Sequence, residues 1–187
     1  MQRPSFQPPH LVPELATSRL LLRGFRAEDL AEFTALHQNP DFYRHLGGKP
    51  LSEEDTWRRI LTQLGHWALR GYGYWALEER ATGRFCGAVG LAEYQRGLTP
   101  SIDGVPEAGW VLAPRLHGQG YAAEAVQAAL TWADAHLAAP RTVCIINPEN
   151  EPSLRLAARF GYHETARPQY HGEPIVLLER RCGDLVM

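Results

Sequence analysis

The stretch that decides the fold is Glu107-Ala-Gly-Trp-Val-Leu-Ala-Pro-Arg-Leu-His-Gly-Gln-Gly-Tyr-Ala122. It begins with a strand-like run over residues 107–112, which Pro114 stops. A short loop with glycines at 118 and 120 follows, and Tyr121 then opens an alanine-rich segment typical of a helix. A strand, a glycine loop and a helix start together favour phosphate binding. The N–H groups of a first helical turn lack partners, and the helix dipole places partial positive charge there.

Composition is that of an ordinary globular protein. The chain has 187 residues, of which 44% are hydrophobic and 21% charged, and this length favours a single domain. A net charge of −2 argues against a nucleic-acid partner. The three cysteines are widely spaced, so we expect neither a disulfide framework nor a metal site, and a cytoplasmic location fits best. We find no secretory signal and no membrane-spanning stretch, and therefore expect no membrane partner.

Hydrophobic periodicity predicts the other elements of the fold. Strands are expected at residues 19–25, 74–78, 85–94, 107–112, 141–147, 162–165 and 175–179, and helices at 27–37, 52–70, 121–136 and 150–161. This order is mixed α/β with an internal β-α-β unit. We expect residues 1–16 to be an irregular N-terminal extension, 17–182 a single domain and 183–187 a C-terminal tail.

Several segments, taken together, resemble one family. The loop Arg115-x-x-Gly118-x-Gly120 resembles the (Gln/Arg)-x-x-Gly-x-(Gly/Ala) signature of the GNAT superfamily of acetyl-CoA-dependent N-acetyltransferases. Other segments resemble its RimJ/RimL-like branch, and these are Thr17-Ser-Arg-Leu-Leu-Leu-Arg23, Glu107-Ala-Gly-Trp-Val-Leu112, Tyr121-Ala-Ala-Glu-Ala125, Asn147-Pro-Glu-Asn150-x-x-Ser153 and Phe160-Gly-Tyr162. The resemblance covers about residues 17–180 in the family's order. It implies a GNAT-like fold, with a central, mostly antiparallel sheet of about seven strands, splayed in the middle, and about four flanking helices.

The resemblance also implies a site for acetyl-CoA, with coenzyme A as product and no metal. The glycine loop and the helix start would hold the pyrophosphate through backbone donors. The residues expected there are Arg115, His117, Gly118, Gln119, Gly120, Tyr121 and Ala122. A tight turn is the alternative explanation for the two glycines. The side chains of Arg115 and Gln119 either contact phosphate or are solvated, and we expect His117 to be an exposed loop residue.

The pantetheine arm is expected beside the strand that precedes the loop. The resemblance implies that the backbone of Trp110, Val111 and Leu112 pairs with it, much as a peptide adds to a sheet edge. The N–H near Val111 would face the thioester oxygen, and such a donor is worth about 3–4 kcal/mol in acyl transfer. By analogy, Asn147 and Asn150 would bind the pantetheine amides, although Asn150 can equally cap the helix that follows it.

Two side chains are candidates for the chemistry. Glu107 is the first candidate for a general base, acting directly or through water, with Glu93 as a second choice; Glu107 could equally be a solvent-facing strand residue. Many GNAT enzymes protonate the departing thiolate with a tyrosine in the last helix, and Ala157 stands at the matching position. Ser153, one turn earlier, could donate to the sulfur instead, or simply cap its helix.

The sequence therefore predicts an N-acetyltransferase that moves acetyl directly from acetyl-CoA to a primary amine in a ternary complex. The acceptor is a protein N-terminus or a small amine of unknown identity, bound near the helices at 27–70 and the loops at 95–106 and 166–174. The protein is expected to be a monomer or homodimer. The alternative is a non-catalytic acyl-CoA-binding or regulatory protein on the same fold. A nucleotide binder using the same loop is disfavoured, because the P-loop and dinucleotide signatures are missing.

Overall fold

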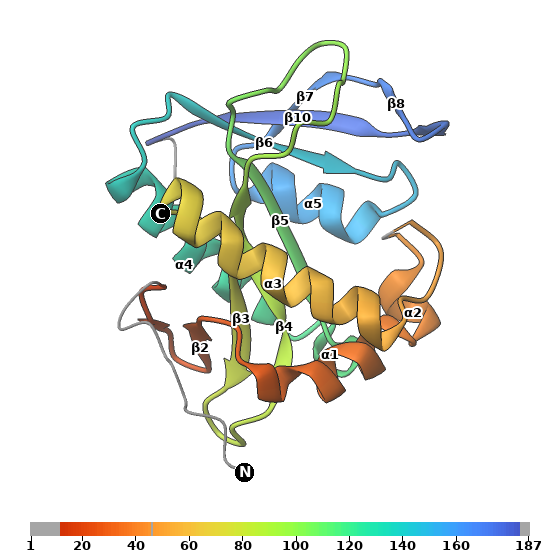
Figure 1. Ribbon diagram of the computed structural model, residues 1–187. Helices are drawn as coiled ribbons and strands as arrows, with labels where there is room; N and C mark the ends of the chain where they lie inside the picture. Colours follow the sequence, from red (N-terminus) through yellow and green to blue (C-terminus); the bar gives the residue numbers. More distant parts are fainter. Residues whose placement is uncertain (1–11, 46, 184–187) are drawn as a thin grey trace.

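The computed structural model, which describes residues 12–45 and 47–183, is a mixed α/β structure with a large, mostly antiparallel sheet (Figure 1). The main sheet has the order β1-β2-β3-β4-β5-β6-β10-β7, and β8 and β9 form a separate pair. The strands are β1 Leu15–Ala16, β2 Leu20–Arg23, β3 Tyr74–Glu79, β4 Phe85–Ala92, β5 Glu107–Leu112, β6 Arg141–Ile146, β7 His163–Ala166, β8 Gln169–Tyr170, β9 Glu173–Pro174 and β10 Val176–Arg181. The helices are α1 Leu30–His37, α2 Pro40–Tyr43, α3 Glu53–Arg70, α4 Tyr121–His136 and α5 Glu151–Arg159. Within this part of the chain, no helix is both long and apolar enough to cross a membrane.

The predicted fold class is confirmed, and the differences are confined to short elements. Periodicity did not predict β1, α2 or the β8–β9 pair, because elements of two to four residues are too short to show a period. β1 falls inside the segment that we expected to be irregular, and it pairs antiparallel with β2. Residues 1–11 and 184–187, most of the predicted extension and tail, lie outside the described residues.

Two helix starts form as their sequences predict. The Ser52 hydroxyl accepts a hydrogen bond of 3.1 Å from the Asp55 N–H at the start of α3. The Asn150 side chain does the same for the Ser153 N–H, at 3.2 Å, at the start of α5. Both bonds satisfy a backbone donor that has no partner within its helix, which fixes where α3 and α5 begin.

The sheet parts between β5 and β6. These strands run parallel, whereas the other neighbours in the main sheet are antiparallel. In the described chain a single register pair, Glu107 with Val143, joins β5 to β6, beside a bond of 3.0 Å from the Val143 N–H to the Pro106 carbonyl. Beyond this point the β5 edge that faces β6 has no strand partner, so its backbone groups are available to a ligand.

Helices cover both faces of the central strands. In Figure 1, α1 and α3 cross in front of them and α4 lies behind. The front core joins Phe33 of α1 and Ile60 of α3 to Ala88 of β4, whereas the rear core joins Val126 and Leu130 of α4 to the sheet. Alternate residues of each strand therefore face different layers, which separates the two sides of β5 chemically.

A buried ion pair fastens β10 to α4, and it supports a stability prediction. Arg180 is fully buried and binds both oxygens of Asp134, at 2.9 and 2.5 Å. We expect Asp134→Asn to lower the free energy of unfolding by about 3–5 kcal/mol, because it leaves a buried charge without its counter-ion. Urea denaturation measures this loss. The control is Glu179→Gln, which breaks the more exposed pair with Arg141 and should cost about 0–1 kcal/mol. Equal losses in the two variants would contradict this reading.

Candidate active site

The glycine loop has the geometry that the sequence suggests for anion binding. Gly118 and Gly120 adopt φ angles of 72° and 80°, a left-handed conformation that residues with a Cβ rarely adopt. Gly120 is the N-cap residue of α4, which continues for 16 residues. The loop is exposed at residues 117–120, so the N–H groups of the first α4 turn can be reached by a ligand.

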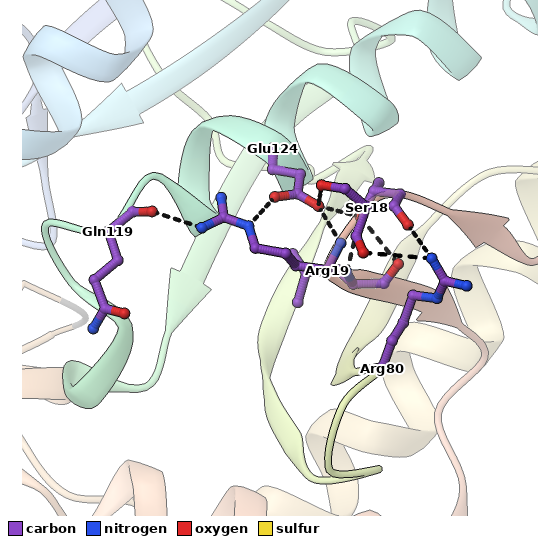
Figure 2. Close-up of polar contacts among 7 residues, drawn as sticks. Ser18, Arg19, Arg80, Gln119 and Glu124 are labelled. Carbon is purple, nitrogen blue, oxygen red and sulfur yellow. Dashed lines mark hydrogen bonds and ion pairs between the residues drawn. The ribbon is translucent and has the colours of Figure 1, made fainter.

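A carboxylate at the start of α4 ties this loop to the other end of the chain. Figure 2 shows Glu124 of α4 beside the segment that leads into β2. Its Oε1 atom accepts bonds from the Thr17 hydroxyl at 2.6 Å, the Ser18 hydroxyl at 2.9 Å and the Arg19 N–H at 2.7 Å. Its Oε2 atom accepts a bond of 2.6 Å from Arg19 Nε. Burial opposes ionisation, but these hydrogen bonds prevail and lower the Glu124 pKa to about 2.

Arg19 extends the same network to the phosphate loop. Its Nη1 donates a bond of 2.9 Å to the Gln119 carbonyl, and its guanidinium lies 4.1 Å from the centre of the Tyr121 ring. Arg80 in turn donates to the Thr17 carbonyl at 2.7 Å (Figure 2). Arg19 thus holds the loop before α4 against the segment that leads into β2, which keeps the backbone donors of the loop in place.

A cavity of about 330 Å³ opens next to this loop, between α4 and α5. Its lining residues are Gly120, Ala123, Glu124, Gln127, Arg159 and Phe160. The size falls within the usual range for ligand sites, roughly 300–1,000 Å³. Glu124 is already bonded to Thr17, Ser18 and Arg19, whereas Arg159 has no carboxylate partner among the described residues. The unpaired charge in the cavity is therefore positive, which suits a phosphorylated ligand.

The free edge of β5 meets the start of α5. Trp110 Nε1 donates a hydrogen bond of 3.3 Å to Ser153 Oγ, across the point where β5 and β6 part. A serine hydroxyl that accepts one bond still has its own proton to donate. Within the described chain that proton has no protein acceptor, so Ser153 can donate to a group placed in the gap.

Asn147 and Asn150 flank the same gap, and each uses its carbonyl end locally. Asn147 Oδ1 accepts from the Glu149 N–H at 2.8 Å, and Asn150 Oδ1 caps α5. Their Nδ2 groups make no hydrogen bond to the described residues. Capping and ligand binding are therefore compatible for Asn150, because the two ends of the amide serve different partners.

Glu107 lies at the place that the sequence indicates, but its carboxylate has a partner that the sequence did not reveal. It is buried, and its two oxygens accept bonds of 2.6 and 2.7 Å from Arg96. Burial disfavours the Arg96 charge, but pairing with Glu107 outweighs it and raises the Arg96 pKa. Glu93, the second candidate base, is likewise paired, with Arg70. Neither carboxylate is free to accept a proton without giving up an arginine.

The remaining loop side chains are directed toward the protein. Arg115 forms an ion pair with Glu79 of β3, so its charge is already balanced. Gln119 Nε2 donates to the Arg115 carbonyl at 2.7 Å. A ring nitrogen of His117 lies 3.0 Å from the Leu112 carbonyl, and this residue is exposed as expected. In this conformation the loop offers a ligand its backbone N–H groups rather than these three side chains.

Comparisons with known proteins identify the family of the chain. The sequence profile of the acetyltransferase (GNAT) domain family matches residues 19–163, well over half of the chain. The chain belongs to the GNAT acetyltransferase family. It is therefore an acetyl-transferring enzyme of the acyltransferase class.

Individual relatives extend over nearly the full length. The uncharacterized protein YkkB of Bacillus subtilis (strain 168) is 30% identical over 174 residues, which cover 90% of this chain and 95% of YkkB. A solved structure assigned to the GNAT family, from Bordetella pertussis, is 32% identical, with a TM-score of 0.81, and the match covers 90% of this chain and 99% of that one. RimL, a ribosomal L7/L12 alpha-N-protein acetyltransferase solved with coenzyme A, shares the fold, with a TM-score of 0.74 at 16% identity over 90% of this chain and 98% of its own.

Sequence reasoning missed three functional candidates in this GNAT domain. Arg19 and Glu124 stand inside two of the segments that resemble the RimJ/RimL-like branch, so their joint occurrence was a usable signal. Arg96 lies in a loop of glycine, proline and polar residues, where no period or motif marks its pairing with Glu107.

The Glu124 network supports a prediction with a defined pH dependence. We expect Glu124→Gln to reduce the free energy of unfolding at pH 7 by about 1–3 kcal/mol, because the donors of Thr17, Ser18 and Arg19 lose a charged acceptor. The folded-state pKa of Glu124 is depressed from 4.5 to about 2. Its contribution is therefore complete above pH 4.5 and disappears as the pH falls through 2.

Urea denaturation of both proteins between pH 7 and pH 2 measures this effect. The difference between wild type and Glu124→Gln should shrink steadily below pH 4.5. The control is Glu151→Gln, which removes an exposed pair with Arg155 and should change stability by less than about 1 kcal/mol. A wild-type advantage that persists unchanged at pH 2 would contradict the role given to the carboxylate.

Proposed function

We propose that this GNAT enzyme transfers acetyl from acetyl-CoA to a primary amine in a ternary complex, as a member of the RimJ/RimL-like branch. The observation that carries the proposal is the parting of β5 from β6, with Trp110 and Ser153 bonded across it beside the glycine loop. The free edge of β5 and the starts of α4 and α5 would together form one elongated site. An extended substrate with a phosphate at one end and a thioester at the other suits such a site.

The residues on both sides of the gap fit coenzyme A. The backbone of residues 118–122 would hold the pyrophosphate, and the cavity beside Arg159 would take the nucleotide end. The free edge of Trp110, Val111 and Leu112 would pair with the pantetheine arm, and the Nδ2 groups of Asn147 and Asn150 would bind its amides. Coenzyme A bound to RimL, which has this fold, supports the assignment.

Acetyl-CoA would supply an activated thioester, and the chain would orient it and the amine. The new bond joins the amine nitrogen to the acetyl carbon, and the bond between that carbon and sulfur breaks. The amine loses one proton, and the thiolate gains one to leave as free coenzyme A. The Val111 N–H would face the thioester oxygen, and the Ser153 hydroxyl would donate to the departing sulfur. A thiol with a pKa of about 8.5 needs little further help, so alanine at 157 is compatible with turnover.

The pairing of Glu107 with Arg96 bears on how the amine is deprotonated. A peptide α-amine has a pKa of about 7.7–8, so roughly one molecule in ten is neutral at pH 7 without any base. A lysine-like amine, with a pKa of about 10.4, would need a strong base. Because both Glu107 oxygens are bound by Arg96, we assign Glu107 to holding Arg96 in place rather than to proton transfer. An acceptor with a weakly basic amine fits this site best.

A direct assay tests the function. The protein is mixed with acetyl-CoA and a panel of peptide N-termini and small amines, and thiol release and acetylated product are followed together. We expect turnover with at least one weakly basic amine and tight binding of coenzyme A by calorimetry. Binding without turnover on any acceptor would favour a non-catalytic acyl-CoA-binding protein instead, and absence of binding would overturn the proposal.

Ser153 gives a sharper prediction. Ser153→Ala should lower kcat about tenfold or more while leaving the KM for acetyl-CoA nearly unchanged, because a hydrogen bond to the developing thiolate exists only during transfer. Steady-state kinetics at saturating acceptor measure both constants. The control is Trp110→Phe, which removes the bond to Ser153 but keeps the serine hydroxyl, and which should retain most of kcat. If Ser153→Ala raised KM alone, the residue would bind substrate only.

The Glu107–Arg96 pair gives another testable prediction. If Glu107 positions Arg96, then Glu107→Gln and Arg96→Gln should lower kcat/KM by similar factors, and the double variant should be little worse than either. The pH–rate profile should keep its wild-type shape. A general base would behave differently, because Glu107→Gln alone would lose about 10²–10⁴-fold in rate and alter the profile.

A further inference from the structure

A second polar cluster lies on the face of β5 turned away from Trp110 and Ser153. Successive strand residues point to opposite faces, so Ala108 and Trp110 face the layer of α4 and α5, whereas Glu107 and Gly109 face the layer of α3. Figure 1 shows α3 crossing in front of β5 on that side. An amine that approaches the gap from this face would not cross the coenzyme A side.

The side of the cluster next to the sheet is formed by Tyr74, which packs over Gly90 and Gly109. Tyr74, Gly90 and Gly109 are in register on β3, β4 and β5, and a Cβ on Gly109 would lie only 2.0 Å from the Tyr74 hydroxyl oxygen. Burial raises the Tyr74 pKa well above its usual value, so the hydroxyl stays protonated. Within residues 12–45 and 47–183 it has no hydrogen-bond partner, and it lies over the middle of β5.

The other side chains of the cluster come from three segments that are distant in sequence. Arg96, from the loop that leads to β5, binds Glu107 and lies 4.4 Å from the centre of the Tyr94 ring and 4.8 Å from that of Tyr170 on β8. His66 of α3 packs edge-on against Tyr94, with the ring centres 5.4 Å apart. The segments expected to surround the acceptor thus converge on one place.

The side of α3 that joins this cluster carries polar residues. Arg59, Gln63 and His66 are spaced by four and three residues, so they lie along one side of the helix. Gln63 is only 7% exposed, and its Oε1 atom has no hydrogen-bond partner among the described residues. The Nδ1 atom of His66 is likewise buried and unpartnered within the described chain. Buried polar atoms nearly always have partners in folded proteins, so these two point to a polar ligand.

The carboxylates around the cluster are already balanced. Glu107 is paired with Arg96, and Glu93 is paired with Arg70. Asp55, one turn before Arg59 on α3, is held by Ser52 and Arg58. In the part of the chain that the structure describes, the cluster therefore offers no unpaired carboxylate to a cationic ligand.

Arg59 carries a positive charge that no carboxylate of the described residues balances. It has no ion pair with a described residue, and its Nη1 lies 3.4 Å from His37 Nε2. His37 adds no second positive charge, because burial, reinforced by the Arg59 charge, lowers its pKa to about 4 and leaves it neutral at pH 7. Arg59 is exposed and lies one turn before Gln63 on the side of α3 that joins the cluster. Its charge opposes the rise that burial causes in the pKa of Tyr74 and of Tyr94.

We propose that this cluster is the acceptor pocket, an inference that rests on the proposed N-acetyltransferase function. The pocket selects an amine that carries a nearby carboxylate, and Arg59 binds that carboxylate. The acceptor class is then an acidic peptide N-terminus or an amino-acid-like amine. A polyamine would bring further positive charge to a cluster where Arg59, exposed and without an ion pair among the described residues, is already positive, and like charges repel.

The test uses three amidated tripeptides, Ala-Glu-Ala, Ala-Gln-Ala and Ala-Lys-Ala, which share the same N-terminal amine. The wild-type protein should acetylate the glutamate peptide with a kcat/KM about ten- to hundredfold above that of the glutamine peptide, the worth of a charge-assisted hydrogen bond. The lysine peptide should be the poorest. Arg59→Gln should bring the glutamate and glutamine peptides to within about twofold of each other, with the KM for acetyl-CoA unchanged.

The matched control is Arg155→Gln, which removes an equal charge from another helix surface, where Arg155 is exposed and paired with Glu151. It should keep the wild-type preference. A preference for the lysine peptide in the wild type, or a glutamate preference that survives Arg59→Gln, would overturn the inference.

Calorimetry of the same peptides with coenzyme A in place of acetyl-CoA separates the two proposals. If the glutamate peptide binds preferentially and Arg59→Gln abolishes the preference, the pocket is established even when no turnover occurs, and only the proposed function fails. Equal or undetectable binding of all three peptides overturns the pocket assignment, whatever the activity on other amines.

Discussion

The structure depends on the carboxylate of Glu124, which collects four hydrogen bonds from Thr17, Ser18 and Arg19 (Figure 2). A helix start with unpaired N–H groups favours an anion, and Glu124 places a negative charge in that first turn. Arg19 offsets this charge, and its contact with the Gln119 carbonyl fixes the loop whose backbone is left open. One carboxylate thereby stabilises the start of α4, anchors the segment that leads into β2 and, through Arg19, holds the glycine loop.

The second constraint is the gap between β5 and β6, which leaves one edge of β5 without a strand partner among the described residues. Trp110 faces the layer of α4 and α5, and Glu107 and Gly109 face the layer of α3. Because neighbouring residues on one strand point to opposite faces, the two proposed substrates would meet at the β5 backbone without sharing a side-chain pocket. The single pair of Glu107 with Val143 holds the strands together where the gap begins.

The sequence predicts what local signals encode. The strand, glycine loop and helix at residues 107–136 follow from a proline, two glycines and an alanine-rich run, and Asn150 caps its helix as its position suggests. The ion pairs that define the site are not local, since Arg19 and Glu124 are 105 residues apart. No periodicity links such residues, and Arg96 lies in a loop without a motif. The sequence likewise did not reveal that Glu107 is paired with Arg96, because only the folded chain brings this partner to it.

The row of Tyr74, Gly90 and Gly109 also limits how enzymes with this row can diverge. A Cβ at Gly90 would lie 2.4 Å from the Gly73 carbonyl oxygen, and one at Gly109 would collide with the Tyr74 hydroxyl. A substitution at Gly90 or Gly109 would therefore disturb the sheet itself before it altered the surroundings of Tyr74. Side chains of α3, of the loop at 95–106 and of β8 reach the cluster from outside the sheet and meet no such backbone collision. If the acceptor binds at this cluster, new acceptor preferences should accumulate in these three segments, while the strands beneath them change little.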